Sequence, residues 1–331
     1  MHVEAFSAGK NPAEPEANED RFVLLPGRAY AVIDGVTDRT GTYYEGRSSG
    51  RIAAEVVRAA LERTLAGDGD PGIEPEALLE LVTREIADVY RKLGLVEQVR
   101  SQPNLRFGAT LALFRHRAAC DEVMLVGDSG IRLDGSRVIQ VDKPLDAITA
   151  SLRVATWRKL EQDGSDAATC NRIARQVVFH GAGQGVDALE GHLDARALAE
   201  IAASAVARNA GRFPHLPVPA IQALVEGGIV HGQFVHQNNA TSPLGYSGVD
   251  GFAIPARHVT IERFPPGSIR RIELFTDGYF KHAESFGVAA WEAAADEVER
   301  VDPDRLGSYE SVKGSQGSIR ADDRTYVGVD A

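Results

Sequence analysis

Several aspartates of this chain lie beside short hydrophobic segments, where a carboxylate is well placed to do chemistry. Asp34 follows Ala-Tyr-Ala-Val-Ile, Asp277 follows Ile-Glu-Leu-Phe-Thr, and Asp128 follows Val-Met-Leu-Val-Gly. Asp322 and Asp323 precede Arg-Thr-Tyr-Val-Gly-Val. A turn is the ordinary interpretation of a single Asp-Gly pair. The recurrence of acids at the tips of expected strands needs a further explanation.

A shared metal site is that explanation. No strand pattern directly follows Asp34 or Asp277, so a two-residue hairpin explains neither well. If the strand tips converge, the carboxylates repel one another and raise each other's pKa. Divalent cations relieve the repulsion, and ligands that are all oxygen select Mg²⁺ or Mn²⁺ over zinc. Two such ions about 4 Å apart would activate a bridging water for in-line attack on phosphorus.

The hydrophobic patterns predict the elements that would position these acids. Strands are expected at 21–25, 29–33, 108–114, 122–126, 131–133, 137–139, 257–262, 269–276 and 324–329. Helices are expected at 48–66, 76–93, 149–162, 166–177, 194–208 and 287–299. The segment 211–249 is rich in Gly, Pro, His and Asn, and we expect it to contain loops. This order of elements favours α+β layers over strict βαβ alternation.

Length, composition and charge limit the class of protein. The chain has 331 residues, of which 44% are hydrophobic and 25% charged, a balance that excludes a fibre or a disordered chain. It has 36 basic and 47 acidic residues and a net charge of −11, which argues against binding nucleic acid or anionic lipid. We find no signal-peptide pattern and no apolar run of about 18 residues, so we expect a cytoplasmic protein without a membrane span.

Six segments in order resemble the motifs of the metal-dependent protein phosphatases of the PPM (type 2C) family, in a bacterial-type member. They are Asn18-Glu19-Asp20, Tyr30–Gly35, Phe107–Leu113, Val126–Ser129, Leu274–Gly278 and Asp322–Thr325. Each is weak alone, but together they extend over residues 18–326, almost the whole chain. The resemblance implies a single phosphatase domain over 1–331, with a variable helix and loop region (a flap) around 142–250. The implied fold is an α+β, four-layer αββα sandwich, in which helix pairs flank two mostly antiparallel sheets.

The resemblance also implies a centre of two divalent cations, Mn²⁺ or Mg²⁺, between the sheets. By motif match, Asp34 would bridge both ions and the carbonyl of Gly35 would bind one of them. Asp277 and Asp322 would bind the other ion. The nucleophile would be a metal-bound hydroxide, and no covalent phosphoenzyme would form.

Further positions follow from the same motif match. Glu19 and Asp20 would hold metal-bound waters, and Asp128 would help to bind a weaker third ion. The implied partner is a phosphorylated protein, dephosphorylated at serine or threonine, and we expect a monomer.

The chain departs from the family pattern near the expected site. The usual Gly-Gly after Asp-Gly is absent, and Val-Thr-Asp38-Arg39 stands there. Asp38 could hold a further water, but we expect a solvated loop acid. Many members have an arginine that grips phosphate shortly before Asn-Glu-Asp, where this chain has Pro-Ala-Glu-Pro-Glu-Ala. Lys10, Arg39 or Arg47 could neutralise phosphate oxygens instead. Gly130 replaces the usual arginine after Gly-Asp-Ser.

These departures leave three functions to distinguish. The first is an active serine/threonine protein phosphatase. The second is a pseudophosphatase, catalytically weak or inactive, that binds or senses a partner. The third is a phosphatase of small phosphoesters. Turnover of an aryl phosphate with Mn²⁺ separates the two enzymes from the binding module, and a phosphopeptide panel separates the two enzymes from each other.

Overall fold

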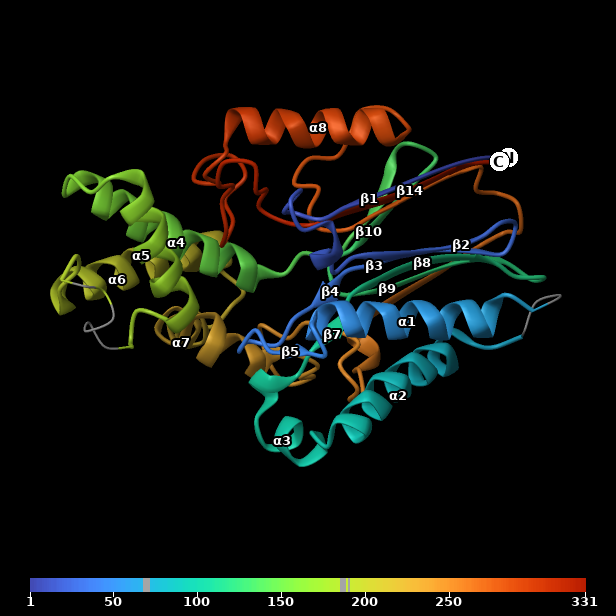
Figure 1. The fold of residues 1–331 in the computed structure, drawn as a ribbon, viewed down its shortest axis with the longest axis horizontal. Coiled ribbons are helices and arrows are strands. Elements are labelled where there is room, and N and C mark those ends of the chain that lie inside the picture. The colour runs from blue at the N-terminus through green and yellow to red at the C-terminus, as the bar shows by residue number, and fades with distance from the viewer. Residues whose placement is uncertain (68–71, 185–188, 190) are drawn as a thin grey trace.

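Two five-stranded sheets form the centre of the fold. The computed structural model describes residues 1–67, 72–184, 189 and 191–331 (Figure 1). The first sheet has the order β1 (His2–Ala8), β14 (Arg324–Asp330), β13 (Arg271–Phe275), β10 (Gly130–Leu133), β11 (Arg137–Ile139). The second has the order β12 (Val259–Phe264), β9 (Asp121–Val126), β8 (Leu111–His116), β3 (Ala29–Ile33), β2 (Arg21–Leu25). All neighbouring strands in both sheets are antiparallel.

Strand β3 shows how the layers are held together. Its residues Tyr30 and Val32 join a core formed with apolar residues of the first sheet. Ala31 and Ile33 point the other way, into a core shared with helices α1 (Ser49–Leu65) and α2 (Pro75–Leu93). Successive side chains of a strand face opposite sides, so the unbroken apolar run of β3 reflects burial on both faces.

Helix α8 (Val288–Val301) covers the outer face of the first sheet. Its Trp291 packs in one buried cluster with Phe275 of β13 and Tyr326 of β14. The predicted αββα sandwich is therefore confirmed, with one difference. The second outer layer consists of α8 alone among the described helices, because α1 and α2 cover the other sheet and the four helices between residues 144 and 227 pack with one another.

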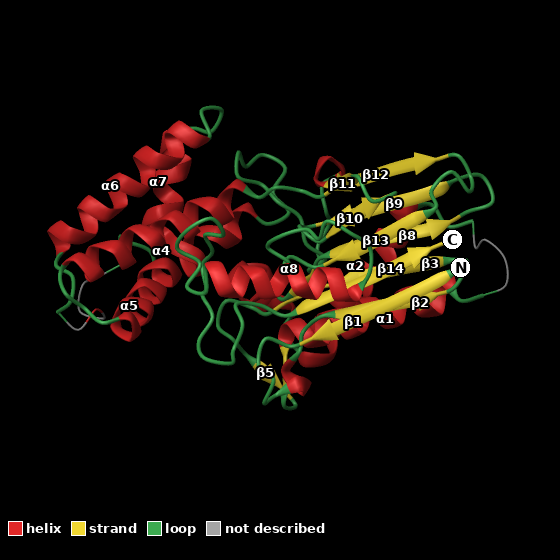
Figure 2. Ribbon diagram, turned by 90° about the horizontal axis from the view of Figure 1, so that it is seen from above, coloured by secondary structure: helices red, strands yellow, loops and turns green. Residues whose placement is uncertain are grey.

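Four helices form a group with its own core. They are α4 (Pro144–Gln162), α5 (Ala167–His180), α6 (Ala195–Arg212) and α7 (Val218–Gly227). Figures 1 and 2 show this helical group beyond the end of the sandwich that is opposite the chain termini. The segment 142–250, where we expected a variable helix and loop region, thus consists mainly of these packed helices.

Proline explains two differences between the expected and the observed helices. Helix α4 begins at Pro144, five residues before the expected start at 149, and α7 lies in the segment expected to contain loops. Both helices have proline in the first turn, where its missing N–H and fixed φ are compatible with a helix. Short helical turns at Gly228–Gln233 and Phe234–His236 follow α7.

Small elements complete the fold. They are β4 (Gly35–Val36) paired with β7 (Gly108–Ala109), β5 (Tyr43–Tyr44) paired with β6 (Arg47–Ser48), and helix α3 (Val96–Ser101). The sequence analysis did not predict β1, which pairs along its whole length with β14 from the far end of the chain. No helix in the described ranges is long and apolar enough to cross a membrane.

Candidate functional site

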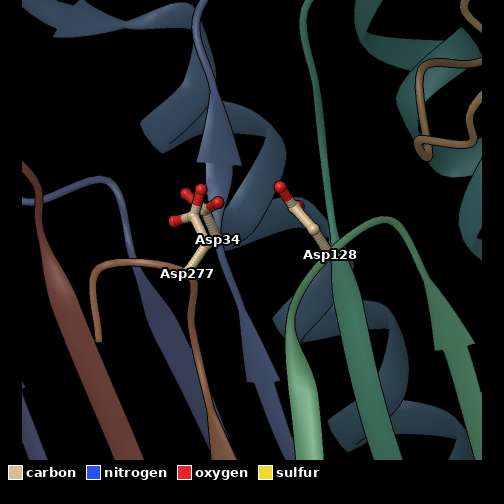
Figure 3. A group of neighbouring side chains, drawn as sticks. All are labelled: Asp34, Asp128 and Asp277. Carbon is tan, nitrogen blue, oxygen red and sulfur yellow. The ribbon is translucent and has the colours of Figure 1, made fainter. Parts of the chain in front are cut away.

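Three aspartates from both sheets converge at the end of the sandwich. Asp34 directly follows β3, Asp128 lies two residues after β9, and Asp277 lies two residues after β13. Each offers a carboxylate oxygen, and these oxygens all lie within 4.8 Å of one another. Figure 3 shows Asp34 and Asp277 side by side, with Asp128 reaching toward them from a neighbouring loop. The strand tips therefore meet, as the sequence led us to expect.

The three aspartates and their neighbours form a strongly acidic centre. Burial raises the pKa of Asp34 well above its usual range, and the charges of Asp277 and Asp20 raise it further. Burial also raises the pKa of Asp277 well above its usual range, assisted by Asp128 and Asp322. Burial and the charge of a neighbouring aspartate raise the pKa of Asp20 to about 7. A nearby cation would reverse these shifts because it favours the charged form of each carboxyl group.

Two buried oxygens at the centre lack a partner. Asp20 is 1% exposed, and its Oδ2 accepts a hydrogen bond of 2.8 Å from the Thr276 hydroxyl. Within the described part of the chain, Oδ1 of Asp20 and Oδ1 of Asp128 have no hydrogen-bond partner. Buried polar atoms are nearly always satisfied, so a bound ion or water molecule is the ordinary explanation. Because the candidate metal ligands of this centre are carboxylate oxygens, they fit Mg²⁺ or Mn²⁺.

Close backbone packing fixes the segment after Asp34. A Cβ on Gly35 would lie 2.4 Å from the carbonyl oxygen of Gly50 and 2.7 Å from that of Glu19, so only glycine fits. The Glu19 carboxylate accepts hydrogen bonds from the hydroxyls of Thr37 and Ser48. Glu19, the acid predicted to hold water, thus joins the loop after Gly35 to the first turn of α1.

Asp38 has a different role from the one expected. It is 4% exposed, so the prediction of a solvated loop acid is wrong. One carboxylate oxygen accepts hydrogen bonds from the amide and hydroxyl of Thr40, and the other accepts one of 2.9 Å from the Ser49 hydroxyl. Asp38 therefore folds the loop that replaces the usual Gly-Gly and ties it to the start of α1.

Asp322 lies beside two ammonium groups. Its Oδ2 is 3.1 Å from Nζ of Lys313, and its Oδ1 is 3.9 Å from Nζ of Lys10. Burial would raise the pKa of Asp322, but these two lysines outweigh it and the pKa lies below its usual range. Asp322 is not among the three aspartates whose oxygens lie within 4.8 Å of one another, but its charge raises the pKa of Asp34 and Asp277, so it lies at the edge of the acidic centre rather than within it.

The three candidate phosphate binders lie in different surroundings. Lys10 borders the acidic centre, where the charges of Asp322 and other acids outweigh burial and raise its pKa. The charge of Arg39 acts on the Tyr246 hydroxyl, where it opposes the rise in pKa that burial causes. Arg47 forms ion pairs with Glu55 at 3.0 Å and with Glu45 at 3.6 Å, outside the acidic centre.

Two lysines at the centre were missed by the sequence analysis. Lys143 lies 2.6 Å from Oδ2 of Asp128, and Lys313 pairs with Asp322. The sequence did contain a signal that could have pointed to them, because lysine is rare in this chain: only six of the 36 basic residues are lysines. Three of those six, Lys10, Lys143 and Lys313, lie beside acids of the centre.

Two glycines explain the shape of the loop that carries Asp128. Gly127 has a φ of +85°, and a Cβ there would lie 2.7 Å from the Thr110 side chain. A Cβ on Gly130 would lie 2.4 Å from the ring of Phe275. The arginine usual at position 130 in the resembled motif would therefore collide with the core.

No protein-family model and no curated protein matches the chain. Among solved structures, the chain is similar to the Mycobacterium tuberculosis serine/threonine phosphatase PstP/Ppp, with 18% identity, coverage of 99% of this chain and 97% of that chain, and a TM-score of 0.42. It is similar to the serine/threonine phosphatase Stp1 from Staphylococcus aureus, with 12% identity, coverage of 100% and 96%, and a TM-score of 0.41.

A third similar structure is the catalytic domain of PstP in complex with two manganese ions, with 15% identity, coverage of 99% and 97%, and a TM-score of 0.41. These three solved structures are serine/threonine phosphatases, as the motif resemblance predicted. At TM-scores below 0.5, the function of this chain has to be argued from its own residues.

Proposed function

We propose that this chain is a metal-dependent phosphatase that hydrolyses phosphoserine and phosphothreonine in proteins, in the manner of the PPM (type 2C) family. The observation that carries the proposal is the convergence of Asp34, Asp128 and Asp277 within 4.8 Å, together with buried carboxylate oxygens that have no partner among the described residues. The substrate class comes from the motif resemblance. We further propose that the chain acts as a monomer in the cytoplasm.

The acids at the strand tips would hold two divalent cations. Asp34 would lie between both ions, the Gly35 carbonyl would contribute to one site, and Asp277 and Asp322 would contribute to the other. When bound, two Mn²⁺ or Mg²⁺ ions would lower the pKa of a water molecule and offset the negative charge of the phosphate. The carboxylates of Asp34, Asp277 and Asp322 lie beside the ends of three different strands, so the packed sheets preorganise the centre.

Three further side chains would position water and substrate. Oδ1 of Asp20 is buried and has no partner in the part of the chain that the structure describes, so it could accept a hydrogen bond from a water at the centre. Glu19 is fixed by two hydroxyls and would assist in holding water. Lys10 is the best placed of the three phosphate-binding candidates, because its ammonium group lies 3.6 Å from Asp323 and 3.9 Å from Asp322 at the edge of the centre.

Metal-dependent turnover tests the proposal. Purified protein should hydrolyse p-nitrophenyl phosphate with added Mn²⁺ or Mg²⁺ and lose this activity in EDTA, since the carboxylates alone cannot activate water at neutral pH. Activity should return when Mn²⁺ is added in excess over EDTA. Full activity in EDTA would contradict the two-metal centre. A panel of phosphopeptides compared with small phosphoesters then tests the substrate class.

One observation favours a binding module without activity as the second candidate. The ion pairs of Asp128 with Lys143 and of Asp322 with Lys313 already supply positive charge to two acids of the centre. A pseudophosphatase would use these ammonium groups in place of metal ions. It would give no turnover of the aryl phosphate at any Mn²⁺ concentration, whereas the enzyme would be activated.

A further inference from the structure

We infer that Lys143 is a built-in cation that orients Asp128 and takes the place of the weaker third metal ion. The inference rests on the proposed two-cation centre, because it concerns what surrounds that centre. It assigns a positioning role to Lys143, whose ammonium group belongs to the chain itself and cannot dissociate as a metal ion would.

The contact between Lys143 and Asp128 is short and shielded. Nζ of Lys143 lies 2.6 Å from Oδ2 of Asp128, and the two side chains are 14% and 10% exposed. The same Nζ lies 3.2 Å from Asp146 and 5.5 Å from the centre of the Tyr246 ring. Gln140 donates a hydrogen bond of 2.8 Å to the backbone carbonyl of Asp128. The segment before α4 thus binds both the side chain and the backbone of Asp128.

This arrangement divides the two oxygens of Asp128 between different tasks. Oδ2 accepts the Lys143 ammonium, whereas Oδ1 has no partner among the described residues. Oδ1 is left for the ions of Asp34 and Asp277, whose carboxylates lie within the same 4.8 Å group. A separate third cation at Asp128 would have to approach beside a fixed positive charge in a site with little water, where like charges repel strongly. We therefore expect two bound ions and no third.

Helix α4 connects this contact with the opposite side of the centre. Lys143 immediately precedes α4, and the buried Arg153 lies on the same helix. Arg153 donates hydrogen bonds of 2.8 Å to the carbonyl of Asp304 and 3.2 Å to that of Ser311. These residues belong to the loop that carries Lys313, the partner of Asp322. One helix of the helical group therefore positions one ammonium directly and the other through the loop.

The number of bound Mn²⁺ ions tests the role of Lys143. The informative variant is Lys143→Gln, because its amide can still donate to Asp128 but carries no charge. Lys143→Arg keeps the charge, and Lys159→Gln removes a lysine from the same helix that pairs with Asp163 rather than with the centre. Bound Mn²⁺ would be counted by equilibrium dialysis over a range of Mn²⁺ concentrations, and the folding of each variant checked by circular dichroism.

We expect about two ions per chain for the wild type, Lys143→Arg and Lys159→Gln, and one additional weaker ion for Lys143→Gln. Adding Asp128→Asn to Lys143→Gln should remove the additional ion, because its ligand is gone. A wild type with three ions, or a Lys143→Gln variant with two ions of unchanged affinity, would overturn the role of Lys143 and leave the metal centre standing. A wild type that binds no Mn²⁺ would overturn both.

Discussion

Asp322 and Asp323 are neighbours in the chain and both lie within 4 Å of the Lys10 ammonium group, but their shorter contacts are with different partners. Asp322 pairs with the ammonium group of Lys313 at the edge of the acidic centre. Asp323 is 5% exposed and accepts hydrogen bonds from two backbone amides, that of Lys10 at 2.7 Å and that of Glu19 at 3.0 Å. Asp323 therefore fastens the N-terminal loop to the start of β14, whereas Asp322 is the acid of this pair that we propose as a metal ligand.

This division predicts different losses for the two alanine variants. Asp322→Ala should raise the Mn²⁺ concentration needed for half-maximal activity, or abolish activity, while changing stability little. Asp323→Ala should lower the free energy of unfolding by about 2 kcal/mol or more, because it leaves two amides without acceptors. Its Mn²⁺ requirement should change much less. Mn²⁺ titrations of activity and urea unfolding in EDTA measure the two effects, and the reverse order would contradict the assignment of Asp322.

In a β-strand, the side chains of two neighbouring residues face opposite sides, which would by itself separate these two acids. In the structure, β14 begins at Arg324, so both acids precede the strand and the alternation does not apply. What separates them is the loop of residues 10–19, whose amides reach Asp323 from the other end of the chain. Contacts across 300 residues leave no local pattern in the sequence, which is also why β1 was missed.

The strand tips were easier to predict than their surroundings. Asp34 and Asp277 end apolar strands, and local patterns reveal such strands. The lysines that contact the centre lie at a helix start and in a loop, and only the tertiary fold brings Lys143 to Asp128. The buried position of Asp38 likewise depends on Thr40 and Ser49, whose hydroxyls no periodicity reveals.

The second prediction concerns Asp34 and Asp277. Asparagine at either position keeps the shape of the side chain but removes the charge that holds a cation. We expect kcat for p-nitrophenyl phosphate to fall at least about a hundredfold at saturating Mn²⁺, the scale of losing a main electrostatic stabiliser. The fold should survive, because the metal-free carboxylates repel one another.

Asp163→Asn is a suitable control for these variants. Asp163 is an exposed aspartate that pairs with Lys159 on α4, away from the three converging acids. Its replacement should leave both kcat and the Mn²⁺ requirement unchanged. If Asp34→Asn turns over at a rate close to that of the wild type, the site assignment is wrong even if the chain is a phosphatase.

The third prediction uses Asp250, a fully buried residue of the segment between the helical group and β12. Its carboxylate accepts hydrogen bonds from the side chains of Gln237 and Asn238 and from the amide of Phe252, and it lies 3.7 Å from Arg106. Burial outweighs these partners and raises the pKa of Asp250 to about 6. In the unfolded chain the pKa of an aspartate is about 4.

The sign of the pH dependence follows from these two values. Between about pH 6 and pH 4 the folded chain binds a proton at Asp250 that the unfolded chain does not, so this group stabilises the fold as the pH falls and loses that contribution as the pH rises through 6. Asp250→Asn cannot titrate. The free energy of unfolding of the wild type should therefore gain about 1 kcal/mol relative to Asp250→Asn between pH 7 and pH 5.

Urea unfolding of both proteins in EDTA measures this difference, because all other titrating groups are common to the two chains. A difference that stays constant or shrinks toward pH 5 would show that the Asp250 carboxylate is ionised throughout, held by Arg106 and its three hydrogen-bond donors.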